Sequence, residues 1–139
     1  MTLQNNKELL PVIQKIGCLY LCLVRMVELE TNTDISTTDI NSIWLEAKEK
    51  NYVSDKNDIV DPDRIIRLLA AETTNPELRL AQVGILTPKG PTFWLWAKRG
   101  NNINYIYCIE KVKTSGPVGT HFRLCNMDRE LIFDSYSFK

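Results

Sequence analysis

The chain has 139 residues, a length typical of one domain, and it can bury a hydrophobic core without disulfides or metal ions to hold it together. Its 17 basic and 17 acidic residues cancel, and neither sign forms a long block. The sequence therefore contains no basic cluster of the kind that binds nucleic acid or an anionic membrane, and we expect neither partner.

The amino-terminal segment predicts where the protein resides. The first dozen residues, MTLQNNKELLPV, lack the basic start and the uninterrupted apolar stretch of a signal peptide. The most apolar run, Ile16 to Val27, is too short to span a bilayer and contains Arg25. We therefore expect a cytoplasmic protein.

Four cysteines in such a chain are predicted to be free thiols, because the cytosol keeps thiols reduced. The less favoured alternative is a four-cysteine zinc site. Cys18 and Cys22 have helical spacing, but Cys108 and Cys125 stand 17 residues apart, whereas structural zinc usually takes closely spaced ligand pairs. We expect no metal ion and no cofactor.

A helix from Cys18 to about Glu30 carries apolar residues around most of its circumference, which is typical of a helix in the middle of a domain. Gly17 stands directly before it and can adopt backbone conformations that other residues resist. The chain is therefore expected to turn sharply at Gly17 and to place Cys18 in the first helical turn.

The remaining pattern predicts an α+β fold with helices over about residues 1–75 and a sheet over about residues 76–139. Two further helices are expected, one capped by Thr37, Thr38 or Asp39 and one starting at Asp61-Pro62. Short β-rich runs separated by turn compositions follow. They are Leu80 to Leu86, Thr92 to Lys98, Asn104 to Lys113, His121 to Cys125 and Leu131 to Tyr136. We predict that the amino-terminal helices pack on a carboxy-terminal antiparallel sheet in a single domain, residues 1–139.

Three tryptophans are predicted to be core residues rather than a platform for a ligand, because aromatic residues in amphipathic elements usually pack inside. Trp94 and Trp96 share one face of their strand, and Phe93 and Leu95 share the other. Both faces of that strand are expected to be covered, as in a central strand. Trp44 falls on the apolar stripe of the second helix.

Cys18, His121 and Asp134 are the candidate catalytic residues. The N-terminus of a helix carries unpaired N–H groups and partial positive charge, which favour a thiolate at Cys18. His121 is the one histidine of the chain. If Met127-Asp128 form a two-residue hairpin loop, His121 faces Asp134 across two strands, and the carboxylate can orient the imidazole.

That hairpin register is supported by its consequence for burial. It sets Phe122, Leu124, Leu131 and Phe133 together on one apolar face of the sheet. His121 and the polar residues of the two strands then share the opposite face.

Three blocks carry a resemblance to a known family. They are Gln14-Lys-Ile-Gly17-Cys18-Leu-Tyr-Leu-Cys-Leu, Gly119-Thr-His121-Phe and Phe133-Asp134-Ser-Tyr. In type and order they resemble the blocks of papain-like cysteine peptidases, especially the compact C39-like branch. The chain is also similar to small phage and plasmid proteins of bacteria, from which no activity carries over.

The papain-like resemblance implies a papain-like fold and a thiol hydrolase that cleaves a peptide or amide substrate through a cysteine thioester. Cys18 would be the nucleophile, His121 the general base and then acid, and Asp134 the residue that orients His121. Gln14 and the backbone N–H of Cys18 would form the oxyanion hole.

The competing hypothesis is a catalytically inactive papain-like domain of phage or mobile-element origin that serves as a binding or scaffolding module. Leu19 and Tyr20 are bulky residues directly after Cys18, and Gln14 precedes it by only four residues. A free cysteine on an apolar helix is also commonly a small core residue.

Overall fold

The computed structural model describes residues 1–86, 92–98, 105–113 and 120–135. Within them the chain is α+β, as predicted, with helices first and strands afterwards. The helices are α1 (Pro11–Ile16), α2 (Cys18–Thr31), α3 (Thr37–Glu49) and α4 (Pro62–Ala70). The strands are β1 (Leu80–Leu86), β2 (Thr92–Lys98), β3 (Tyr105–Lys113), β4 (Thr120–Cys125) and β5 (Leu131–Asp134). The turn compositions predicted between β1 and β4 fall outside the described residues.

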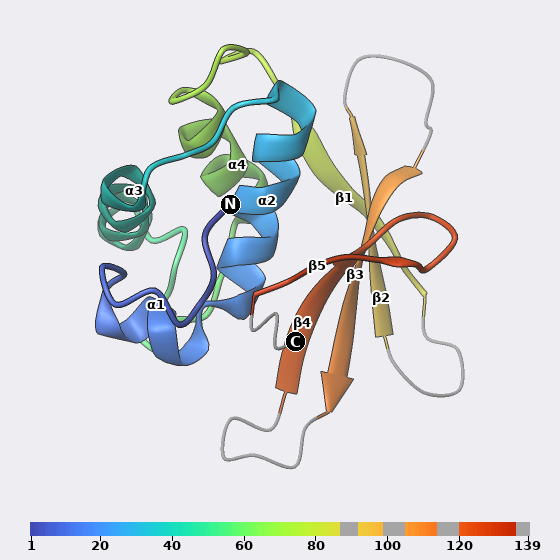
Figure 1. Cartoon of the computed structure of the whole chain (residues 1–139), viewed down its shortest axis with the longest axis horizontal. Coiled ribbons are helices and arrows are strands. Elements are labelled where there is room, and N and C mark those ends of the chain that lie inside the picture. Colours follow the sequence, from blue (N-terminus) through green and yellow to red (C-terminus); the bar gives the residue numbers. More distant parts are fainter. Residues whose placement is uncertain (87–91, 99–104, 114–119, 136–139) are drawn as a thin grey trace.

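The five strands form one antiparallel sheet in the order β1-β2-β3-β4-β5, so each strand pairs with its neighbour in sequence. Figure 1 shows the helices gathered on one side of this sheet. β2 lies inside the sheet, and Phe93, Leu95 and Trp96 are all buried. The prediction that both faces of this strand are covered is confirmed.

α2 is the central helix that the apolar pattern predicted. Its buried residues point in nearly every direction around its axis, and it packs against β4, β5, α1 and α4. Leu23, Met26 and Val27 are completely buried. In the parts of the chain that the structure describes, no helix combines the length and the apolar character needed to cross a bilayer.

Gly17 joins α1 to α2, but the reason that glycine is needed there differs from the predicted one. Its φ is −84°, an ordinary value that any residue adopts. The need for glycine is spatial, because a Cβ atom at this position would lie 2.5 Å from the backbone oxygen of Ile13. The sharp turn thus comes from the close approach of two short helical segments, and α1 itself was not predicted.

The helix caps agree with the sequence prediction in one case and differ in the other. Asp61 caps α4, as predicted, since its side chain accepts a hydrogen bond from the backbone N–H of Arg64. The cap of α3 is Ser36, whose Oγ accepts from the N–H of Asp39 at 3.1 Å. The cap therefore lies one residue before the earliest of the three predicted caps. Several polar residues in this stretch can cap a helix, so the sequence does not single out Ser36.

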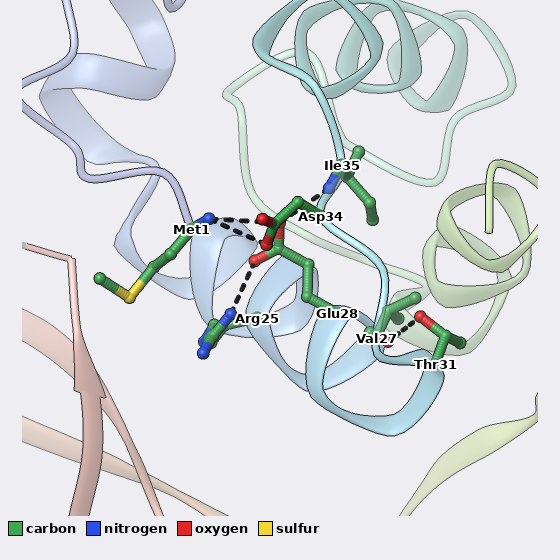
Figure 2. Close-up of polar contacts among 7 residues, drawn as sticks. All are labelled: Met1, Arg25, Val27, Glu28, Thr31, Asp34 and Ile35. Carbon is green, nitrogen blue, oxygen red and sulfur yellow. Dashed lines mark hydrogen bonds and ion pairs between the residues drawn. The ribbon is translucent and has the colours of Figure 1, made fainter. Parts of the chain in front are cut away.

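A buried carboxylate ties the carboxyl half of α2 to the chain before α3 (Figure 2). Glu28 is 2% exposed, and its Oε2 accepts a 2.8 Å hydrogen bond from the backbone N–H of Ile35. Its Oε1 lies 3.4 Å from Nη1 of Arg25. The α-ammonium group of Met1 lies 3.8 Å from the same carboxylate and 3.1 Å from Asp34. These partners compensate for removing the carboxylate from water.

Candidate active site

The hairpin between β4 and β5 has a three-residue loop, so the predicted two-residue loop is wrong. Asn126 and Glu130 close the loop through a 2.9 Å backbone hydrogen bond. Met127 and Asp128 form the turn, and Arg129 adopts the left-handed conformation with φ 65°. This is the common arrangement of a turn followed by a left-handed residue. The Oδ1 of Asn126 stabilises it by accepting from the N–H groups of Asp128 and Glu130.

The longer loop, together with an irregularity next to Cys125, shifts the strand register. Asp134 pairs with Arg123, not with His121 as predicted. The predicted apolar face is therefore partly wrong, because Phe133 is buried but Leu131 is 54% exposed. One extra residue in the loop and one at the irregularity together move the downstream pairs by two residues, and the sequence did not signal either.

His121 and Asp134 nevertheless meet. The Nε2 atom of His121 lies 2.6 Å from Oδ1 of Asp134. The contact survives the register shift because residues two apart on one strand lie on the same face, and a diagonal neighbour across an antiparallel pair remains within reach of long side chains. The His121 side chain is 7% exposed and that of Asp134 is 23% exposed. An imidazole and a carboxylate are therefore held in contact at this end of β4 and β5.

Cys18 is buried at the start of α2, beside the β4 backbone. One turn later, the Sγ of Cys22 lies 3.6 Å from the backbone oxygen of Phe122, which shows how closely α2 approaches the strand that carries His121. Burial raises the pKa of the Cys18 thiol, and the negative charge of Asp134 adds to the increase. Backbone hydrogen bonds from Phe122, Leu19 and Cys18 itself lower that pKa in part. The N–H groups at the helix start lower the pKa, but burial outweighs them, so the prediction that the fold favours a thiolate at Cys18 is wrong.

Gln14 does not join this group. It lies on α1, and its Nε2 donates a 2.7 Å hydrogen bond to the backbone oxygen of Leu9. The role of Gln14 in an oxyanion hole stays a prediction. Gln14 precedes Cys18 by only four positions, so it lies in the helical turn that precedes Gly17.

Sequence reasoning missed a contact that holds the end of β5. The backbone N–H of Gln4 donates to the oxygen of Ser135 at 2.8 Å, and the Ser135 hydroxyl donates to Oε1 of Gln4 at 2.7 Å. Both residues are buried, at 1% and 0% exposure. Ser135 directly follows Asp134, so the amino-terminal segment positions the strand end that carries the carboxylate. No local pattern could indicate a contact between residues 131 apart.

A cavity of about 390 Å³ opens beside Cys18. Two aromatic pairs line it, one from the helices and one from the sheet. The ring centroids of Tyr20 and Trp44 are 5.1 Å apart, and those of Trp94 and Phe122 are also 5.1 Å apart. The prediction that the tryptophans are core residues holds for Trp44 and Trp96, which are buried. Trp44 and the partly exposed Trp94 also form walls of the cavity.

The four cysteines do not form one metal site. Cys18 and Cys22 lie on α2, whereas Cys108 and Cys125 are paired across β3 and β4 in a separate apolar cluster. The pleat of β4 turns Cys125 away from the face on which Leu124 meets the helices. Among the residues that the structure describes, no three His, Cys, Asp or Glu side chains gather to hold a metal ion.

The buried thiols predict a loss of stability at alkaline pH. Burial raises the pKa of all four cysteines, that of Cys125 to about 11 from an ordinary 9.0. The fold favours the neutral thiols, so their contribution to the free energy of unfolding is complete below pH 9. That contribution is lost as the pH rises toward the pKa that the thiols have in the folded protein. Cys125 alone should cost about 2 kcal/mol of unfolding free energy by pH 11. Urea unfolding at pH 7, 9 and 10.5 would measure this, and a flat profile would contradict it.

A family model described as "Protein of unknown function, DUF261" matches residues 1–82, which is more than half of the chain. The matched part contains the four helices and the start of β1, and therefore Cys18 but not His121 or Asp134. No curated protein and no solved structure matches the chain.

Proposed function

The chain belongs to the DUF261 family of proteins of unknown function, and from its site we propose that it is a papain-like thiol hydrolase that cleaves an amide bond through a thioester on Cys18. The observation that carries the proposal is the 2.6 Å contact between His121 and Asp134, together with a cysteine at the start of α2 that lies beside the backbone of the strand carrying His121. The negative charge of Asp134 also raises the pKa of the Cys18 thiol, so the carboxylate and the sulfur influence one another.

The geometry supports a general-base mechanism. Asp134 engages Nε2 of His121, which makes Nδ1 the ring atom that takes the thiol proton. The sulfur attacks the amide carbon, and the backbone N–H groups of Cys18 and Leu19 at the helix start are suited to stabilise the oxyanion. His121 then gives the proton to the leaving amine. Water hydrolyses the thioester and restores the thiol, with His121 acting again as base and acid.

The raised pKa of Cys18 determines the order of events. A protonated thiol is a poor nucleophile, so the proton has to move to His121 as the substrate carbonyl arrives. This differs from a preformed thiolate and imidazolium pair. Cys18 of the hydrolase should therefore react with small electrophiles more slowly than a preformed thiolate, but faster than a buried thiol that has no base beside it.

A second candidate is a catalytically inactive binding domain, in which Cys18 is a core residue. Its 4% exposure and raised thiol pKa favour this alternative. The two candidates differ in whether His121 acts on the sulfur.

Alkylation distinguishes them. With iodoacetamide at pH 7.5 and peptide mapping, Cys18 should react faster than Cys22, a matched buried thiol one turn further along the helix. His121→Ala should slow Cys18 to the rate of Cys22, while far-UV circular dichroism stays unchanged. Equal slow reaction of all four thiols in the native protein would favour the inactive domain. Hydrolysis of peptide p-nitroanilides, lost in Cys18→Ala, is the corresponding activity measurement.

A further inference from the structure

The cavity beside Cys18 has a composition that points to a ligand. Besides the two aromatic pairs, aliphatic side chains line it at Ile16, Leu19 and Ile59. Its volume of about 390 Å³ falls in the range of small-molecule pockets. An aromatic ring inserted here would contact tilted rings from α2 and α3 on one side and from β2 and β4 on the other.

The walls are held by contacts of their own. The Tyr20 hydroxyl donates a 2.7 Å hydrogen bond to the backbone oxygen of Ile40, so the phenol is satisfied and its ring is fixed in place. Nζ of Lys48 bonds Oδ1 of Asn57 at 2.6 Å and anchors the loop that closes one side. A cavity with fixed aromatic walls costs a ligand less in reorganisation than one that must form on binding.

The charges at the cavity cancel. Lys111 contributes an ammonium group and Asp58 a carboxylate, and both residues are exposed. One charge of each sign gives neither an anionic nor a cationic ligand a net advantage. The preferred occupant is therefore neutral, and its apolar surface drives binding.

We propose that this cavity binds a neutral aromatic side chain of the substrate and so positions the adjacent amide at Cys18. Cys18 forms part of the cavity wall, so the positioning of the amide for cleavage rests on the proposed function. Binding itself is independent of catalysis and can be measured without it.

The test uses the full chain with Cys18→Ala and follows tryptophan fluorescence, since Trp44 and Trp94 line the cavity. N-acetyl-phenylalaninamide should quench this fluorescence and bind at least about tenfold more tightly than N-acetyl-alaninamide. The amides of N-acetyl-aspartate and N-acetyl-lysine should bind no better than the alanine compound. Equal affinities, or preference for a charged amide, would overturn the proposal.

Two variants locate the binding site. Thr120→Phe adds a ring to the cavity wall from β4 and should abolish binding of the phenylalanine compound. Trp96→Phe changes a buried tryptophan of the same strand as Trp94 that is not part of the cavity lining, and it should retain binding. Retained affinity in a folded Thr120→Phe protein would overturn the assignment.

Binding and catalysis can fail separately. Aromatic binding without hydrolysis by the native chain would leave the cavity assignment standing and defeat the hydrolase. Hydrolysis of p-nitroanilides without aromatic preference would defeat the cavity assignment alone.

Discussion

Replacing Asp134 with asparagine should lower kcat/KM for amide hydrolysis by about 10³- to 10⁴-fold. The carboxylate accepts from Nε2 of His121 at 2.6 Å and so holds the tautomer whose Nδ1 can take the thiol proton. An asparagine amide can instead donate to Nε2 and favour the other tautomer. The hydrolysis rate at saturating and limiting substrate would measure the loss.

The tautomer is a second readout, which reports the contact between Asp134 and His121 independently of activity. His121 is the one histidine in the chain, so nitrogen NMR of the imidazole gives a single, unambiguous pair of ring signals. The native protein should show the form protonated at Nε2, and Asp134→Asn should show a mixture or the reverse.

Asp128→Asn is the matched control for this change. It makes the same substitution on an exposed residue at the tip of the same hairpin, where only the backbone N–H is bonded to Asn126. Activity and tautomer should stay unchanged there. Full activity in Asp134→Asn would remove the carboxylate from the mechanism.

Replacing Glu28 with alanine should reduce the unfolding free energy by about 3–5 kcal/mol. The substitution leaves the backbone N–H of Ile35 without its acceptor and takes the carboxylate away from Arg25, which is 22% exposed (Figure 2). Unpaired buried donors carry the full cost of desolvation. Urea unfolding at pH 7 would measure the difference from the native protein.

A surface carboxylate provides the comparison. Glu46 pairs with Lys50 at 2.8 Å across one helical turn, and its side chain is 44% exposed. Glu46→Ala should cost less than about 1 kcal/mol, because exposed pairs are screened by water. Glu28→Gln keeps an acceptor for Ile35 and should fall between the two. A Glu28→Ala protein as stable as the Glu46→Ala protein would show that the buried network does not stabilise the fold.

The elements could be predicted because their signals are local. The apolar circumference of residues 18–30 identified α2, Asp61-Pro62 identified the start of α4, and a β-rich run between turn compositions identified β2. Each depends on the spacing of side chains within one segment, which periodicity expresses directly. The six-residue α1 and the Ser36 cap were missed, because a short helix and a choice among neighbouring hydroxyls leave little such signal.

The contact between His121 and Asp134 was predicted correctly, but the strand register that produces it was not. His121 and Asp134 meet although their predicted register is wrong, since both remain on one face of the sheet after the shift. Gln14 donates a hydrogen bond to the backbone oxygen of Leu9, a contact that the spacing between Gln14 and Cys18 did not indicate. The contact of Gln4 with Ser135 and the aromatic cavity join distant segments, so no spacing along the chain could indicate them.

The amino-acid sequence by itself determined the order of helices and strands, the buried central helix and the residue types available for chemistry, because these follow from local periodicity and side-chain character. Only the tertiary structure decided that burial outweighs the helix N-terminus at Cys18, that Asp134 binds His121 diagonally, and that two aromatic pairs enclose a cavity. Desolvation, register and enclosed volume arise from how segments pack against one another, and each depends on neighbours that are remote in the chain.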